Sequence, residues 1–142
     1  MFNESFATAF AQKGVQLWLK EKGEFKRLKK YQDTLRRRDE FRGVLQEAKT
    51  QLGLIYKNTS NDSVDTLQNH KQEFFQSFKR TCFNLRKKWN SKNALEGWID
   101  EEVNNAKLAA SSIYLLKVPY FTELWGQANE DPKTYIELVK KL

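Results

Sequence analysis

The sequence predicts an all-α fold, a bundle of long antiparallel helices with a kinked C-terminal helical segment. Apolar residues recur every three or four positions over long stretches, and no stretch alternates with the period of two that marks a half-buried strand. The 142 residues include only two prolines and six glycines, which favours long helices over a turn-rich β architecture. Hydrophobic residues make up 39% of the chain, enough to form a core rather than a disordered tail. We therefore expect one helical domain that spans residues 1–142.

The N-terminal half contains three predicted helices. The first runs from about Asn3 to Lys20, where its first residue suits the N-cap, and Gly23 is a natural stop after it. The second runs from Glu24 to about Lys57 and is followed by a polar loop at residues 58–63. The third runs from about Val64 to Trp89 and carries a continuous apolar stripe. Short loops between such helices predict antiparallel packing.

The C-terminal half is predicted to consist of shorter helical pieces. Leu95–Ile99 carries apolar anchors of a short connecting turn or helix, and a longer helix begins near Asn104. Val118-Pro119 interrupts that helix, because proline lacks a backbone donor and disfavours a helical residue before it. Tyr120–Trp125 continues as a second segment, and Asp131-Pro132 is a good N-cap and N1 pair for a last helix.

Charge and cysteine content limit the classes of function. The 25 Lys and Arg against 18 Asp and Glu give a net charge of +7, which permits attraction to nucleic acid or anionic lipid without demanding it. The basic runs Arg36–Arg38 and Arg86–Lys88 are typical of solvated helix faces. The lone cysteine, Cys82, excludes an internal disulfide and a thiolate zinc cluster. Because it lies on the apolar stripe of the third helix, we expect a buried, unreactive thiol.

Two motif blocks stand out in the chain. The first is Phe2-Asn3-Glu4-Ser5-Phe6-Ala7-Thr8, followed by Gly14 and Trp18-Leu19. The second comprises Asn104-Asn105-Ala106, Leu108-Ala109, Tyr114, Val118-Pro119 and Phe121. An arginine-rich helix that ends in Leu54-Ile55-Tyr56 connects them. In this order, the blocks resemble a family of bacterial zinc aminopeptidases of the gluzincin type.

The resemblance implies roles for a few residues. Glu4 corresponds to the third zinc ligand, a carboxylate that lies about 2.0–2.2 Å from the metal. Two imidazole ligands and the general base come from a His-Glu-x-x-His helix, which is absent from this sequence. Tyr114 corresponds to a hydroxyl that stabilises the oxyanion, and Asn3, Asn104 and Asn105 to supporting residues around the site.

Structural roles for the same residues stay open as alternatives. Asn3 and Asn104 could cap helices, and Tyr114 could pack and form hydrogen bonds without any catalytic role. The single histidine, His70, cannot replace a pair spaced by one helical turn. It borders the apolar stripe of its helix, and we therefore expect a packing or surface histidine.

We expect this sequence to be the C-terminal part of a larger catalytic unit, inactive alone and without bound zinc. The complete protein would hold Zn²⁺ and a peptide substrate, and its N-terminal portion would be the main partner of this chain. The resemblance suggests an exported, periplasmic or lipid-anchored parent. The face formed by Phe2, Phe6 and Phe10 would then be exposed here and could support a homo-oligomer. Nucleic acid is not an expected partner, although a basic helical nucleic-acid-binding module and a non-catalytic interaction module remain alternatives.

Overall fold

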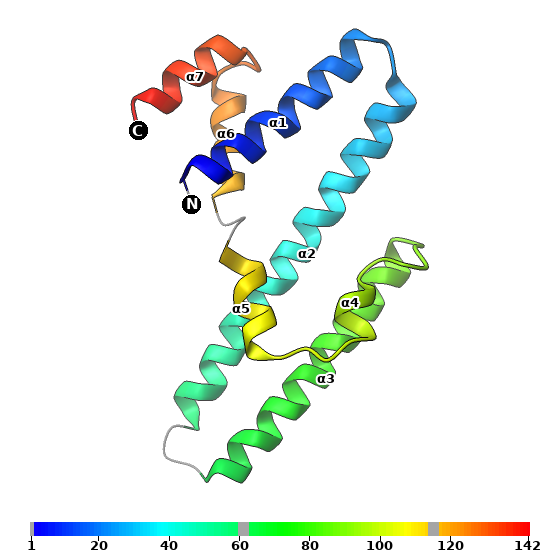
Figure 1. Ribbon diagram of the computed structural model, residues 1–142, viewed down its shortest axis with the longest axis vertical. Coiled ribbons are helices and arrows are strands. Elements are labelled where there is room, and N and C mark those ends of the chain that lie inside the picture. Colours follow the sequence, from blue (N-terminus) through cyan, green and yellow to red (C-terminus); the bar gives the residue numbers. More distant parts are fainter. Residues whose placement is uncertain (1, 60–62, 114–116) are drawn as a thin grey trace. The chain divides into compact units, whose positions relative to one another are not determined.

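The computed structural model describes residues 2–59, 63–113 and 117–142, with residues 2, 112 and 113 described by their backbone alone. These ranges contain helices and no strand, and the predicted all-α fold is confirmed. None of the helices in these ranges is both long and apolar enough to cross a membrane. The helices are α1 (Phe2–Glu21), α2 (Phe25–Asn58), α3 (Val64–Lys88), α4 (Glu96–Ile99), α5 (Asn105–Ile113), α6 (Val118–Gln127) and α7 (Pro132–Lys140) (Figure 1).

The helices end where local hydrogen bonding can satisfy their free backbone groups. Gly23 has a φ of 69° and stops α1 in a left-handed conformation that glycine adopts without steric cost. The Gly23 N–H donates to the Lys20 carbonyl and the Glu24 N–H to the Leu19 carbonyl, which is a Schellman motif. Ser63 caps α3 by accepting the Thr66 N–H at 3.2 Å.

The predicted C-terminal boundaries are also found. Val118 begins α6 with Pro119 in its first turn, so the predicted interruption is present, while the connecting residues 114–116 lie outside the described ranges. The Asp131 Oδ2 accepts the Thr134 N–H at 2.7 Å and caps α7, as the Asp-Pro pair predicted.

The chain divides into two compact units. Unit 1 comprises Met1–Thr34 and Ile113–Leu142, and unit 2 comprises Leu35–Ser112. This grouping does not test the prediction of one domain, which stays a prediction.

Unit 1 has an aromatic core in which α1 packs against α6, and α6 against α7. The Tyr135 ring stacks on both Phe6 and Phe10, with centroid distances of 5.7 and 6.0 Å. Its buried core residues come from all three helices and the turn after α6: Ala9, Val118, Phe121, Leu124, Trp125, Ala128 and Tyr135.

This packing corrects the expectation of an exposed phenylalanine face on the first helix. Phe6 and Phe10 are half-buried against the core of their own unit, where Phe10 meets Trp125 edge to face at 6.2 Å. The expectation was wrong because the apolar partners, on α6 and α7, are distant in sequence. The predicted self-association itself stays a prediction, and the Phe2 side chain lies outside the described part.

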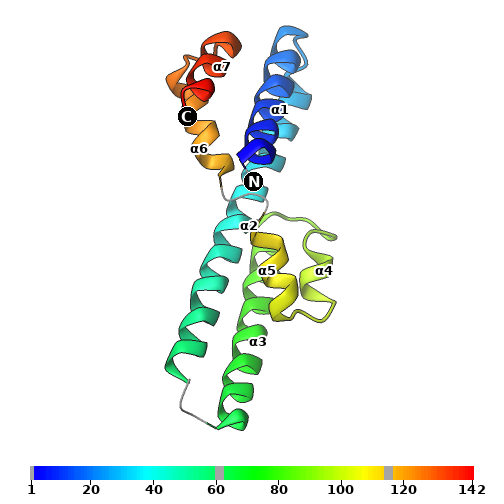
Figure 2. The ribbon, with the colours of Figure 1, turned by 60° about the vertical axis from the view of Figure 1, so that its left-hand side comes forward.

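Unit 2 is built on a helical hairpin. The part of α2 that belongs to this unit and α3 run antiparallel, with α4 and α5 beside them (Figure 2). The Trp98 ring of α4 contacts Phe41 of α2 at 5.4 Å and Phe78 of α3 at 5.8 Å between centroids, edge to face in both cases. The buried core residues are Leu45, Ala48, Leu52, Phe78, Cys82, Val103 and Leu108.

Candidate functional site

Glu4, the predicted zinc ligand, lies in the first turn of α1. Its side chain is exposed, as is that of Asn3 before it, whereas Ser5 after it is buried. Helical spacing places Glu4 on one face with Ala7 and Ala11, which are also exposed. The residues that neighbour the carboxylate on this face therefore have small side chains.

The opposite side of α1 is fixed by the aromatic core of unit 1. Phe6, two residues after Glu4, contacts Phe121 of α6 edge to face, with centroids 5.8 Å apart. Phe6 belongs to the first motif block of the sequence and Phe121 to the C-terminal end of the second, so the first block and this end of the second pack together in unit 1. Rigid aromatic packing on one side of the helix holds the Glu4 carboxylate on the other.

Asn104 and Asn105 stand at the start of α5 in unit 2. The Asn104 Oδ1 accepts the Lys107 N–H at 3.0 Å, so Asn104 does cap a helix, as the structural alternative proposed. The Asn105 Nδ2 donates to the hydroxyl of Tyr56, which lies in the last turn of α2. The Asn105 Oδ1 is buried and has no hydrogen-bond partner in the described part of the chain.

The predicted site residues are distributed over both units. Asn3 and Glu4 belong to unit 1, whereas Asn104 and Asn105 belong to unit 2, and each pair is described within its own unit. Tyr114, the predicted oxyanion stabiliser, lies outside the described residues.

The donors present do not by themselves fit a zinc site. Within residues 2–59, 63–113 and 117–142, no group of three or more His, Cys, Asp or Glu side chains is placed to hold a metal ion. Cys82 is fully buried, and that burial raises the pKa of its thiol to about 11, so it is protonated at neutral pH. His70 is exposed on α3, as a surface histidine. Zinc in a catalytic site takes three protein ligands, so a zinc ion on Glu4 would need donors from outside this set.

Unit 2 contains two hollows that sequence reasoning did not find. A groove of about 980 Å³ between α2 and α3 is lined by apolar residues such as Val44 and Phe74 and by polar residues such as His70. A second hollow of about 610 Å³ is lined by Asn104 and Asn105, among others. Both form between helices that meet only in the folded chain, and no local spacing in the sequence signals them.

The basic runs are largely used in contacts within unit 2, around Glu40. The Arg36 Nη1 and the Lys88 Nζ lie 2.8 and 3.3 Å from the Glu40 carboxylate oxygens, and the Trp89 Nε1 donates to it at 2.7 Å. Arg37 donates to the Trp89 carbonyl at 3.0 Å. The Trp89 hydrogen bond, followed by Lys88 and Arg36, holds the pKa of Glu40 below its usual value.

This network was missed because only part of it is visible in the sequence. The spacing of Arg36 and Glu40 predicts an ion pair on one helix face. No pattern in the sequence brings Lys88 and Trp89 to the same carboxylate, since they come from the far end of α3. The contacts give these basic runs a structural role and do not favour the nucleic-acid-binding alternative.

Comparison with known proteins gives a single informative result. No curated protein and no solved structure gives a significant match. The family model described as "Putative aminopeptidase" matches residues 1–142, and the chain therefore belongs to that aminopeptidase family.

Proposed function

We propose that this chain is the helical portion of a zinc-dependent aminopeptidase and that Glu4 supplies the carboxylate ligand. The two histidine ligands and the general base would come from a His-Glu-x-x-His helix outside these 142 residues. The observation that carries the proposal is the position of Glu4, exposed on a helix whose other face is fixed by the aromatic core, in a chain matched over its whole length by an aminopeptidase family model.

The small side chains around Glu4 support this assignment. The exposed face of α1 near Glu4 carries the small residues Ala7, Ala11 and Gly14. A side chain added at Gly14 would contact nothing within 4 Å. A second helix that carries the other ligands could therefore approach closely enough for direct coordination. Zinc in such a site would polarise the scissile carbonyl of a peptide substrate.

The other predicted residues take supporting roles in this proposal. Tyr114 would donate its hydroxyl to the developing oxyanion, as fixed donors do generally. Asn3 would orient the Glu4 carboxylate, and Asn104 and Asn105 would order the start of α5, one through its cap and the other through Tyr56. The isolated chain would neither retain zinc nor hydrolyse peptides, because a single carboxylate holds the metal weakly.

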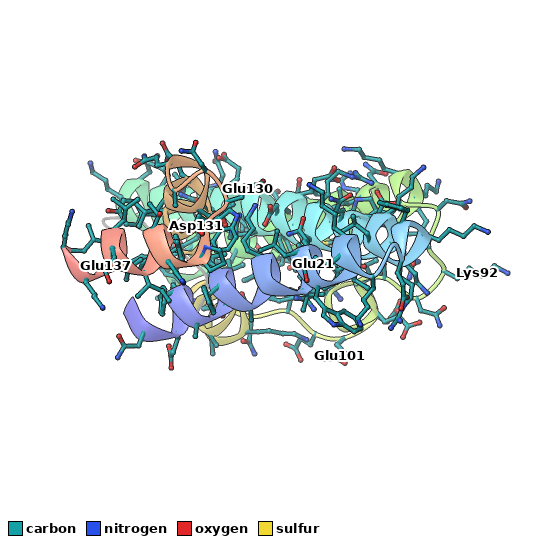
Figure 3. All side chains as sticks on the ribbon, turned by 90° about the horizontal axis from the view of Figure 1, so that it is seen from above. Glu21, Lys92, Glu101, Glu130, Asp131 and Glu137 are labelled. Atoms are coloured by element: carbon teal, nitrogen blue, oxygen red, sulfur yellow. The ribbon has the colours of Figure 1, made fainter. Side chains whose placement is uncertain are left out.

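The test compares Glu4→Gln with Glu21→Gln in the complete gene product. Glu21 is the last residue of the same helix and serves as the matched control (Figure 3). We expect Glu4→Gln to weaken zinc affinity by at least about a hundredfold, since even outer partners of a metal site contribute 10- to 100-fold. Hydrolysis of aminoacyl anilides should fall in parallel, while the thermal unfolding midpoint stays unchanged.

Two results would contradict the proposal. One is a Glu4→Gln protein that keeps its bound zinc, measured by elemental analysis, together with its activity. The other is peptide hydrolysis by the 142-residue chain alone, purified with zinc, since the proposed site is incomplete in it.

A further inference from the structure

Exposed apolar side chains gather where α1 turns into α2. Phe25, the first residue of α2, is 65% exposed, and Trp18 of α1 is 48% exposed. Val15, one helical turn before Trp18, is 38% exposed. We call residues 15–30, all of which lie in unit 1, the α1–α2 corner (Figure 1). Large apolar side chains exposed this close together mark an interaction surface more often than isolated ones do.

The same corner carries a dense set of cations. Its exposed basic residues are Lys20, Lys22, Lys26, Arg27, Lys29 and Lys30. Residues 15–30 contain two carboxylates, Glu21 and Glu24, of which Glu24 is paired with Arg27 at 2.6 Å, and Glu130 of the same unit lines a hollow together with Lys20. The charge excess of the corner is therefore available to an external anion.

Contacts between α1 and α2 order the corner. Leu19 is buried at 4% exposure, Gly23 closes the turn in its left-handed conformation, and the Gln16 and Gln32 side chains approach within 3.5 Å across the two helices. These contacts fix the two helix ends, and Trp18 and Phe25 are exposed on them.

The opposite end of α2 provides an internal comparison. Leu54 and Tyr56 are also exposed there, and Val64 at the start of α3 is 76% exposed. At that end, Lys57 is followed in sequence by Asp62 and Asp65, and the Lys71 Nζ lies 5.8 Å from the centroid of the Tyr56 ring. The α1–α2 corner thus combines two strongly exposed aromatic rings with clustered lysines, whereas the less exposed Phe83 ring of α3 is covered by Arg86 and Lys87 at 5.1 and 4.8 Å from its centroid.

We propose that the α1–α2 corner docks onto an anionic lipid surface. Phe25 and Trp18 would enter the interfacial layer, where aromatic rings partition favourably, and the lysines would lie over the anionic headgroups. A duplex polyanion such as double-stranded DNA would pair its phosphates with the lysines and would leave the apolar side chains of Val15 and Phe25 in water. This inference does not depend on the proposed peptidase function.

Vesicle co-sedimentation of the 142-residue chain tests the proposal. We expect binding to vesicles that contain phosphatidylglycerol, no binding to pure phosphatidylcholine, and weakening with salt. The fluorescence should shift to the blue on binding, and the shift should come from Trp18, because Trp89 and Trp125 are buried at 7% and 2% exposure and Trp98 is half-buried against the core of unit 2. Trp18→Phe should abolish most of that shift while the protein still sediments.

Charge and apolar variants have matched controls. Lys26→Glu/Lys29→Glu/Lys30→Glu should weaken binding on the order of a hundredfold or more, from about fivefold for each lost lysine. The same charge change at Lys92, Lys133 and Lys141, which are exposed outside residues 15–30, should weaken it much less; Figure 3 shows the Lys92 side chain pointing away from the ribbon. Phe25→Ser should weaken binding more than Val64→Ser, although Val64 is the more exposed residue.

Several outcomes would overturn the proposal. They are absence of binding to anionic vesicles at low salt, equal loss in the two triple variants, and no difference between Phe25→Ser and Val64→Ser. Equal affinity for an oligonucleotide, with the same dependence on Phe25, would also overturn the assignment to lipid. Circular dichroism of each variant separates loss of binding from loss of folding.

Discussion

Unit 1 and unit 2 are both helical, but they are assembled in different ways. Unit 1 joins the two ends of the described chain, and its stability rests on stacked rings from α1, α6 and α7. Unit 2 is one continuous stretch of the chain, and its helical hairpin buries aliphatic and aromatic side chains. Hydrogen bonds and ion pairs around Glu40 connect α2 with the C-terminal end of α3. The comparison shows that the apolar face of a helix can be buried in two ways. In unit 1 aromatic rings from distant parts of the sequence cover it, and in unit 2 the neighbouring helix of a hairpin covers it.

The difference bears on function because each unit contains one of the candidate regions. Glu4 depends on the aromatic core of unit 1 for its position, whereas Asn104 and Asn105 depend on the hairpin of unit 2. A change that loosens one unit should therefore affect one region before the other.

The largest expected effect is that of Phe121→Ala on unit 1. The ring is fully buried and contacts Phe6, so its loss should lower the free energy of unfolding by about 3–5 kcal/mol. Hydrogen exchange should then accelerate in α1, α6 and α7 before it does in α3. Phe25→Ala, at a site with 65% exposure, is the control and should cost roughly 0.5 kcal/mol. Equal acceleration in both units would show that they unfold together.

A second effect concerns alkaline pH and Cys82 in unit 2. Burial raises the pKa of this thiol from 9.0 to about 11, so the unfolded chain releases the proton first. The stabilisation is fully present below pH 9 and is lost as the pH rises toward 11, by up to about 2–3 kcal/mol. Chemical unfolding across this range should show a steeper decline for the wild type than for Cys82→Ala, and parallel declines would refute the assignment.

A smaller effect on stability is expected at acidic pH, where Glu40 becomes protonated. Because the pKa of this carboxyl is lowered in the folded state, its stabilisation is present above the usual value of 4.5 and lost as the pH falls through the lowered value. Glu40→Gln should reduce the denaturant midpoint at neutral pH and flatten the acid dependence. Glu73→Gln, an exposed glutamate on α3, is the control, and an identical acid profile in both variants would argue against the network.

The smallest expected effect is at Tyr135, in the core of unit 1. Its hydroxyl is buried without a hydrogen-bond partner among the described residues, and burial raises the pKa of the group. Tyr135→Phe should leave the stability of unit 1 unchanged or increase it by up to about 1 kcal/mol, because it removes a buried polar group and keeps the ring stack. A clear loss of stability in thermal unfolding would mean that the hydroxyl has a partner.

The sequence by itself determined the helices and many of their ends. Apolar spacing, Gly23 and the Asp131-Pro132 pair act within a few residues of each other, so their effects can be read locally. The buried state of Cys82 followed from the same periodicity. The motif blocks likewise pointed to the aminopeptidase family, which the family model supports.

Only the tertiary structure decided which apolar faces are covered. It placed Phe6 and Phe10 against Tyr135, when helical spacing alone left their partner open, and it gathered Lys88 and Trp89 on Glu40. The physical reason is that burial and hydrogen bonding depend on contacts between segments far apart in the chain. Periodicity shows that a face is apolar, but it carries no information about which distant face will pack against it.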